Sequence, residues 1–544
     1  MRRLAVALLA GVVALSACSK SAPTGVEGGR TNSWTVPHTL RYANAEDINS
    51  LNPLLSQQLT VSYMSSMTAA WLTKWNAHNL PYPELATAVP TKANSGISQD
   101  GLAITYHLRK GLKWSDGAPL NADDVVFTYH AVMNPANNVT SRAGWDLITK
   151  VDEPDKYTVT FHLRKPYSPF VVTFCSSVGG NTSILPKHLL AQYPNLNNVP
   201  FNALPVGAGP FKYKEWERAQ KIVMIPNPYY FRGHPKLQEV DFDIIPNRDT
   251  VLTTLQAHEL DMWLDVPGAY YDRVTKLSGY GVMHNDAYRW GHIDFNLSHP
   301  VFADPVVRHA IELATDRVTL NQKFQHGIQS LQEGPAPKSA PYYDPNIPSV
   351  AFNIAKANAM LDAAGWKRGP DGIREKNGTK LNLLFATSTG TPNVDNQIEF
   401  FRSTWQQVGV GIQVRRYPAA ILFAPPGDGG IVYTGKWDVI LFQWSDDPIG
   451  DFSFVFACDQ IPPNGQNDVH WCNPTANAAM QKVFSDYDQA QRNADDRVVF
   501  EQFAKDLPEI VLYGVQEIYV YNNDLKGFHP NSVTPFDDMM NVDI

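Results

Sequence analysis

The hydrophobic pattern of this chain changes along its length, and this change constrains the fold more than any single motif. Residues 103–109 and 157–163 alternate apolar and polar side chains, which is typical of half-buried strands. Between them, Asn121 is a suitable N-cap for an amphipathic helix. These segments predict a small, partly antiparallel α+β unit over residues 80–204.

The pattern after Phe295 alternates helices with strands. Asp304 and Asn353 are suitable N-caps for two predicted helices, and the continuous apolar run 439–442 suits a buried strand. This part of the chain therefore predicts an α/β lobe, in which helices cover a sheet. A later apolar stretch, residues 508–520, predicts a strand that returns to an earlier unit.

Length and charge exclude several classes of protein. The 544 residues correspond to three or four units at about 150 residues each. Lys and Arg number 45 against 53 Asp and Glu, which gives a net charge of −8 without a long basic run. Nucleic acid is therefore not an expected partner, because phosphate binding relies on clustered Lys and Arg.

The N-terminal sequence predicts that the protein is exported from the cytoplasm. Arg2 and Arg3 precede the apolar run 4–15, which is too short to span a bilayer and is typical of a signal peptide over residues 1–17. The sequence Leu15-Ser16-Ala17-Cys18 resembles a bacterial lipobox, so Cys18 is the predicted lipid anchor and residues 18–31 a flexible tether. An ordinary cleaved signal is the alternative. No later stretch is long and apolar enough to span a membrane, so the body is expected in the periplasm or at the cell surface.

The other three cysteines leave two alternatives open. A disulfide between Cys458 and Cys472 would leave Cys175 as a buried thiol. Three free buried cysteines are the other alternative.

The absence of catalytic and phosphate-binding motifs counts against an enzyme. The chain has no G-x-S-x-G elbow and no phosphate-binding loop, and His258-Glu259 is followed by Met262 where a zinc protease needs histidine. A glycosidase pair of carboxylates stays an alternative, because its two residues are close in space and need not be close in sequence. The glycine-rich stretch 206–211 is interpreted as a hinge or turn, since Pro210 occupies the place where a phosphate-binding helix would begin. No cofactor and no metal site is predicted.

The loop after the buried strand 439–442 is the best candidate site. Ligands of open α/β sheets bind beyond the carboxyl ends of the strands, and here the strand runs into Trp444-Ser445-Asp446-Asp447-Pro448. The alternative is a solvated acidic turn with a packed Trp.

Several blocks occur in the order found in one protein family. They are Pro83-Glu84-Leu85-Ala86, Ser98 to Gly101, Tyr106 to Val125, Gly207 to Phe211, Asn227 to Tyr230, Asp304 to Ala310 with Asp316-Arg317, and Leu361 to Trp366. With these blocks the chain resembles the family 5 extracellular solute-binding proteins of bacterial ABC importers, the dipeptide- and oligopeptide-binding lipoproteins.

The resemblance implies an α/β fold, a two-lobed periplasmic-binding-protein clamp (type II-like) with an extra small α+β domain. Lobe I is expected to combine residues 32–79, 205–298 and 515–544, with the small domain, residues 80–204, attached to it. Lobe II is expected over residues 299–514.

The resemblance also implies the function of a substrate-binding component that captures oligopeptides by hinge closure and delivers them to an ABC permease. It places Trp444 at the ligand and assigns the α-amine of the peptide to Asp446 or Asp447, because a carboxylate in a dry cleft forms a charge-assisted hydrogen bond with an ammonium group. A monomer that touches the membrane only through its lipid is expected. The alternatives are an extracytoplasmic hydrolase, a chaperone or sensor without a transporter, and a binder of an oligosaccharide, a metal complex or haem.

Overall fold

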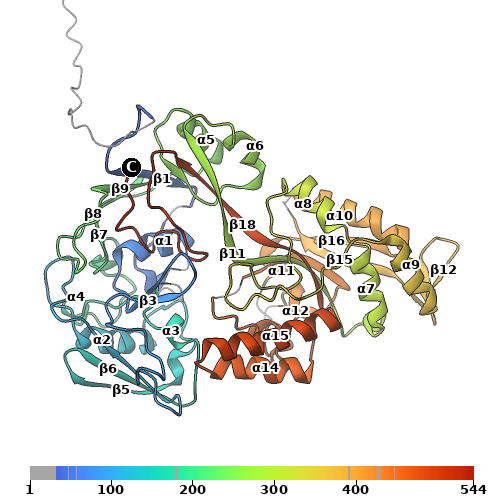
Figure 1. Ribbon diagram of the computed structural model, residues 1–544, viewed down its shortest axis with the longest axis horizontal. Coiled ribbons are helices and arrows are strands. Elements are labelled where there is room, and N and C mark those ends of the chain that lie inside the picture. Colours follow the sequence, from blue (N-terminus) through green and yellow to red (C-terminus); the bar gives the residue numbers. More distant parts are fainter. Residues whose placement is uncertain are drawn as a thin grey trace, which may run out of the picture.

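The computed structural model describes residues 32–46, 48–56, 58–177, 182–389, 392–424, 429–445 and 448–544. Two bodies lie side by side and are joined by two long antiparallel strands, β11 (Tyr280–Phe295) and β18 (Glu509–Asn522) (Figure 1). We call the part that precedes β11, together with the segment after β18, the first body. The part between β11 and β18 is the second body.

Within the described ranges, ten strands form one mixed sheet in the order β16-β15-β17-β11-β18-β10-β1-β9-β8-β7. Its other strands are β1 (Thr39–Asn44), β7 (Phe211–Glu217), β8 (Lys221–Pro226), β9 (Glu239–Ile244), β10 (Met262–Trp263), β15 (Asn382–Ser388), β16 (Gly411–Tyr417) and β17 (Val439–Ser445). Strand β1 pairs in parallel with β9 and β10, and β15 pairs in parallel with β16 and β17. Strands β11 and β18 lie between these two groups, so both bodies share them. The late strand predicted over residues 508–520 is confirmed as β18.

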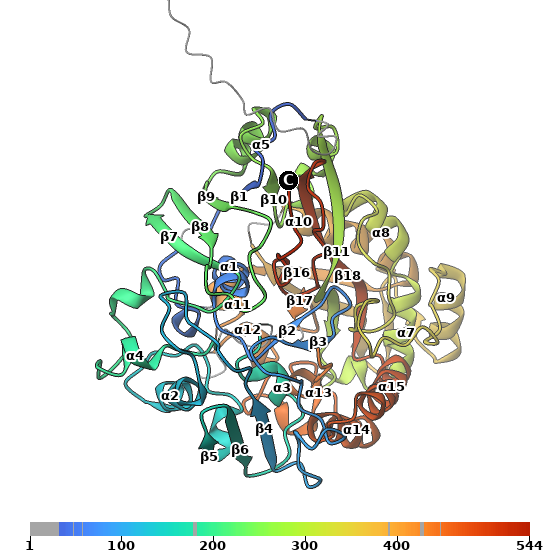
Figure 2. The same cartoon turned by 60° about the vertical axis from the view of Figure 1, so that its left-hand side comes forward.

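Helices cover the strands of the second body on both faces (Figures 1 and 2). They are α7 (Pro305–Leu313), α8 (Arg317–Phe324), α9 (Ile354–Ala363), α10 (Pro392–Trp405), α11 (Ala419–Leu422), α12 (Ile431–Thr434), α13 (Ser453–Phe456), α14 (Pro474–Ser485) and α15 (Gln489–Asp506). The predicted caps are confirmed, because Asp304 accepts a hydrogen bond from the Val306 amide and Asn353 from the Lys356 amide. Helices α7, α9 and α10 bury apolar side chains against Ile293 on one sheet face. Helices α14 and α15 pack on Trp290 on the other face.

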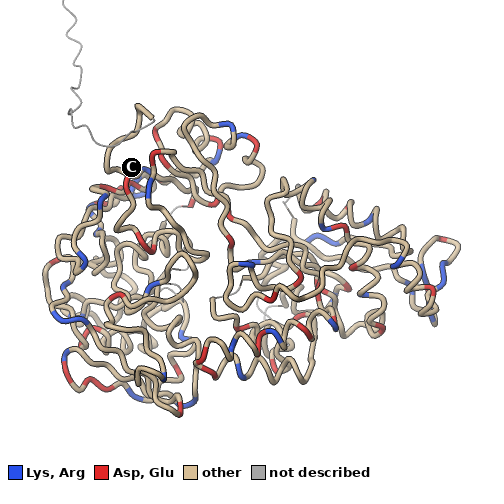
Figure 3. Tube along the Cα trace, viewed as in Figure 1, with Lys and Arg blue, Asp and Glu red and all other residues tan. Residues whose placement is uncertain are grey.

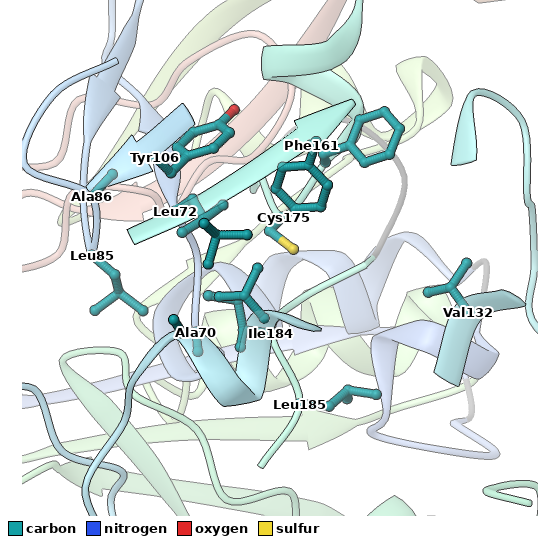
Figure 4. Close-up of a cluster of buried hydrophobic side chains, with 14 of the residues drawn as sticks. Ala70, Leu72, Leu85, Ala86, Tyr106, Val132, Phe161, Cys175, Ile184 and Leu185 are labelled. Carbon is teal, nitrogen blue, oxygen red and sulfur yellow. The ribbon is translucent and has the colours of Figure 1, made fainter. Parts of the chain in front are cut away.

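The small α+β unit is an antiparallel sheet β4-β6-β5 with a helix against it. Its elements are β4 (Ala103–His107), β5 (Ile148–Asp155), β6 (Thr158–Leu163), α2 (Ala122–Met133), α3 (Phe170–Thr173) and α4 (Lys187–Leu190). Asn121 begins α2 in a capping box with Asp124, as predicted for an N-cap. Cys175 lies free and buried in the core of this unit, beside Tyr106 and Phe161 (Figure 4).

The remaining strands and α-helices lie outside these groups. They are β2 (Thr73–Trp75), β3 (Pro81–Pro83), β12 (Lys367–Arg368), β13 (Arg374–Lys376), β14 (Thr379–Lys380), α1 (Leu59–Thr68), α5 (Arg248–Gln256) and α6 (Tyr271–Val274). Lys and Arg are interspersed with Asp and Glu along both bodies (Figure 3). In the described part of the chain, no helix has the length and apolar character that crossing a membrane requires.

Cys458 and Cys472 form a disulfide, with their Cα atoms 4.7 Å apart. Of the two alternatives that the sequence left open, this is the one in which Cys175 remains a thiol. The bond closes a loop between α13 and α14, next to the packed side chain of Trp471.

The glycine-rich stretch 206–211, which the sequence predicted as a hinge or turn, packs closely against the end of α1. A Cβ atom at Gly207 would lie 1.9 Å from the carbonyl oxygen of Thr68, and one at Gly209 would lie 2.2 Å from that of Met67. The Gly209 amide also donates a hydrogen bond to the Thr68 carbonyl at 3.1 Å. The two glycines are therefore required for the close backbone contact between this stretch and the end of α1.

We expect Gly207→Ala to destabilise the protein by more than 2 kcal/mol, because the clashing atom is backbone and cannot rotate away. Urea unfolding of the mature chain measures this change. Gly268→Ala is the matched control, since nothing lies within 4 Å of a Cβ atom there. Equal stability of the two variants would contradict the close contact.

Candidate functional site

The end of strand β17 lies where the two bodies meet. Trp444 and Ser445 pair with Trp290 and Arg289 of β11. The pairing of β11 with β18 shifts register between Asp286 and Trp290, so β17 ends beside the irregular part of the shared strands. Trp444 and Ser445, which were predicted in the loop after residues 439–442, are instead the last two residues of the strand, because their pairing with β11 continues it through Ser445. Asp446 and Asp447, like Cys18, lie outside the described residues.

Trp444 belongs to an aromatic wall and is only partly buried. Its ring centroid lies 5.2 Å from that of Phe442 and 6.2 Å from that of Phe454, both in edge-on arrangements. These neighbours fix the indole while part of its surface remains accessible. A fixed and partly exposed aromatic ring can contact a ligand with little loss of side-chain freedom.

The segment after the candidate loop contacts the first body. Ile449 is buried in a cluster with Trp75 and Val172 of the first body. A cavity of about 210 Å³ lies beside this cluster, lined by Pro448 and Ile449 from one body and by Trp75, Leu80 and Val172 among others from the other. A pocket lined by both bodies therefore lies next to the predicted site.

A second contact between the bodies lies at the turn between α14 and α15. The Tyr487 hydroxyl donates to the carbonyl of Gly101 at 3.0 Å, and the Ser168 hydroxyl donates to the carbonyl of Val483 at 2.7 Å. In Figure 1, α14 and α15 reach the first body near α3. Ser168 and Tyr487 also line the cavity, so the two bodies are in contact at two places around it.

A polar network that no sequence motif indicates lies beside the register shift between β11 and β18. Arg289 forms an ion pair with Glu517 at 2.8 Å, and the Tyr519 hydroxyl donates to the same carboxylate at 2.6 Å. The Tyr63 hydroxyl donates to Asp265 at 3.2 Å. A cavity of about 220 Å³ beside this register shift is lined by Asp265, Arg289 and Glu517, among others. Its residues come from both bodies, and no local sequence signal joins them.

Burial and the charge of Glu517 raise the pKa of Asp265 to about 7. The unfolded carboxyl titrates near about 3.9, so between these two values the folded protein binds more protons at this group than the unfolded chain. This group therefore stabilises the fold fully below about pH 4, and its contribution is lost as the pH rises through about 7.

We expect Asp265→Asn to remove that loss of stability, which amounts to at most about 4 kcal/mol. Urea unfolding at pH 4.5, 6 and 8 measures the change, and the difference between wild type and variant should grow with pH in favour of the variant. Exposed Asp249→Asn is the control. A difference that does not change with pH would contradict the assignment.

Comparison with known proteins identifies relatives of this chain. The profile of the bacterial extracellular solute-binding proteins, family 5 Middle, matches residues 81–460. The oligopeptide-binding protein AppA of Bacillus subtilis (strain 168) is 28% identical over 441 residues, which cover 79% of this chain and 79% of that protein.

Solved structures agree over nearly the whole chain. The structure of AppA from Bacillus subtilis in complex with a nonapeptide has a TM-score of 0.67 at 25% identity and covers 91% of this chain and 97% of that one. The structure of NikZ from Campylobacter jejuni in complex with Ni(L-His) has a TM-score of 0.70 at 24% identity and covers 91% and 96% of the two chains. The second of these likenesses shows the fold alone.

Proposed function

This chain belongs to family 5 of the bacterial extracellular solute-binding proteins, and from that premise we propose that it is the substrate-binding component of an ABC importer, which captures oligopeptides and delivers them to a membrane permease. The observation that carries the proposal is the family match over residues 81–460, joined to a relative that is named for oligopeptide binding. Proteins of this family bind solutes for transport and are not enzymes, and the predicted two-lobed α/β fold is confirmed.

Each proposed lobe contains one group of parallel strands of the ten-stranded sheet. Lobe I combines residues 32–79, 205–298 and 515–544 with the small domain 80–204, and lobe II comprises residues 299–514. The division is supported by the two parallel groups of strands, which lie on opposite sides of β11 and β18. Hinge closure would occur in these two strands, and the register shift of β11 between Asp286 and Trp290 supports that location.

The proposed ligand site lies at the end of β17. Trp444 would pack on the peptide, and Asp446 or Asp447 would accept hydrogen bonds from its α-amine. The peptide backbone would be held by main-chain hydrogen bonds, which do not depend on side-chain identity. The position of Trp444 beside the shared strands and the cavity at Ile449 support this site.

Native mass spectrometry of the mature chain, purified without refolding and sprayed under gentle and denaturing conditions, tests the ligand class. A ladder of released masses that match short peptides is expected. A single sugar, haem or metal complex would keep the importer and replace the ligand. An empty protein that also shows no thermal stabilisation by peptides would reject the proposal in favour of the hydrolase or the chaperone.

We also propose that Cys18 carries the lipid anchor and that the monomeric body works outside the cytoplasm. Membership in a family of extracellular solute-binding proteins supports this location. We expect Cys18→Ala to move the protein from the membrane fraction to the soluble fraction of the cell, because the lipid would be its only attachment. Fractionation with immunoblotting measures this, and Ser19→Ala is the control that should stay at the membrane. Retention of Cys18→Ala at the membrane would contradict the anchor.

A further inference from the structure

A histidine and several carboxyl groups are enclosed inside the second body, behind the aromatic wall. His292, Asp294 and Glu509 each offer one ligand atom, and these atoms lie within 4.8 Å of one another. The carboxyl group of Asp468 interacts with that of Asp294. All four residues are at most 1% exposed.

The register of the shared strands brings these side chains together. His292 and Asp294 are two residues apart on β11 and therefore face the same side of the sheet. Asp294 pairs directly with Glu509 of β18. Phe442 of β17 pairs with His292, and its ring lies 4.5 Å from the imidazole, so it closes the cluster on that side.

The cluster has more polar atoms than hydrogen bonds. His292 Nδ1 lies 2.7 Å from Asp294 Oδ1 and 3.6 Å from Glu509 Oε2, and Trp290 Nε1 donates to Glu509 Oε1 at 2.7 Å. If the carboxyl groups are ionised, four buried atoms lack a hydrogen-bond partner: His292 Nε2, Asp294 Oδ2, Asp468 Oδ2 and Glu509 Oε2. The Asp294 carboxyl group lies against those of Glu509 and Asp468, so these groups need either shared protons or a cation. Among the described residues, no Lys or Arg forms an ion pair with these carboxyl groups. Buried carboxylates without a cation are strongly unfavourable.

We propose that this cluster binds one divalent transition-metal ion, Zn²⁺ in the first place, with His292, Asp294 and Glu509 as ligands and Asp468 beside them. An imidazole combined with carboxylates suits Zn²⁺ or Mn²⁺, whereas Ca²⁺ and Mg²⁺ prefer oxygen ligands alone. Because the cluster is closed to solvent, the ion would be structural and would enter during folding. It would join β11, β18 and the loop of Asp468, and it does not depend on the ligand of the cleft.

Refolding in the presence of defined metals tests the site. The mature chain without a histidine tag is unfolded in guanidinium with a chelator, and is then refolded with Zn²⁺ alone, Mn²⁺ alone, Ca²⁺ alone or no metal. Bound metal is counted by mass spectrometry after gel filtration, and Tm is measured by calorimetry. We expect one Zn²⁺ per chain and a rise in Tm of about 5 °C or more over the metal-free protein. Ca²⁺ should give neither.

Two variants locate the ion. His292→Gln and Glu509→Gln are expected to lower Zn²⁺ occupancy at least tenfold. Asp265→Asn, which removes a partly buried carboxyl group outside the cluster, should retain one ion per chain. If a variant fails to refold, the wild-type measurement decides. A wild type that refolds without Zn²⁺ and with the same Tm would overturn the proposal, because the carboxyl groups would then share protons. Full occupancy in His292→Gln would also overturn it, since the ion would lie elsewhere.

Discussion

Replacing both aspartates of the candidate loop, in Asp446→Asn/Asp447→Asn, is expected to weaken binding of a free-amine oligopeptide by about 30-fold to more than 1000-fold. Removing one partner of a buried, hydrogen-bonded charge pair costs about 2–5 kcal/mol, and each 1.4 kcal/mol is a factor of ten in Kd. The single variants then show which carboxylate binds the amine. Titration calorimetry with a peptide from the native mass ladder measures the effect.

Acetylation of the peptide N-terminus provides the control. The acetylated peptide should bind the wild type as weakly as the free peptide binds the double variant, and the two changes together should add little. This non-additivity is the signature of one shared interaction. If acetylation leaves the wild-type Kd unchanged, the loop does not bind an amine and ligand selection must come from another part of the cleft.

Local signals made much of the fold predictable. Helices α2, α7 and α9 begin where Asn121, Asp304 and Asn353 cap them, since each cap is a contact between residues two or three apart. The strands β6 and β17 follow from alternation and from an apolar run, which are also local patterns. The end of β17 was predicted three residues too early, at residue 442, because the apolar run stops there while the pairing with β11 continues through Trp444 and Ser445.

Features made of distant residues could not be predicted in this way. Strand β11 has 16 residues and pairs with β18 from Tyr280 to Asp294, while β17 pairs with its other edge only from Arg289 onward, which no periodicity indicates. Arg289 forms an ion pair with Glu517, which lies 228 residues later in the sequence. Asp294 lies beside Glu509 only because the register of β11 and β18 pairs the two residues. The glycine-rich stretch 206–211 is predicted only as a hinge or turn, because glycine permits both flexibility and close approach, and the contact with the Thr68 carbonyl depends on a distant part of the chain.

Removing the disulfide, in Cys458→Ser/Cys472→Ser, is expected to lower the free energy of unfolding by about 3 kcal/mol. The bond joins residues 14 apart, and a crosslink over a loop of this length restricts the unfolded chain by about that amount. Urea unfolding of the oxidised wild type and of the variant measures the change, with buried Cys175→Ala as the control for loss of a sulfur atom. Reductant should destabilise the wild type and Cys175→Ala alike, and should leave the double variant unchanged.

The effect should be largest in the second body, because the closed loop holds several buried side chains. Asn467 donates hydrogen bonds to the carbonyl of Trp471 inside this loop and to that of Ala457 just before it, and Trp471 Nε1 donates to Asp506 at the end of α15. Hydrogen exchange should therefore increase first in α13 to α15, while the small α+β unit keeps its protection. Equal loss of protection in both bodies would show instead that the shared strands transmit the destabilisation through the whole sheet.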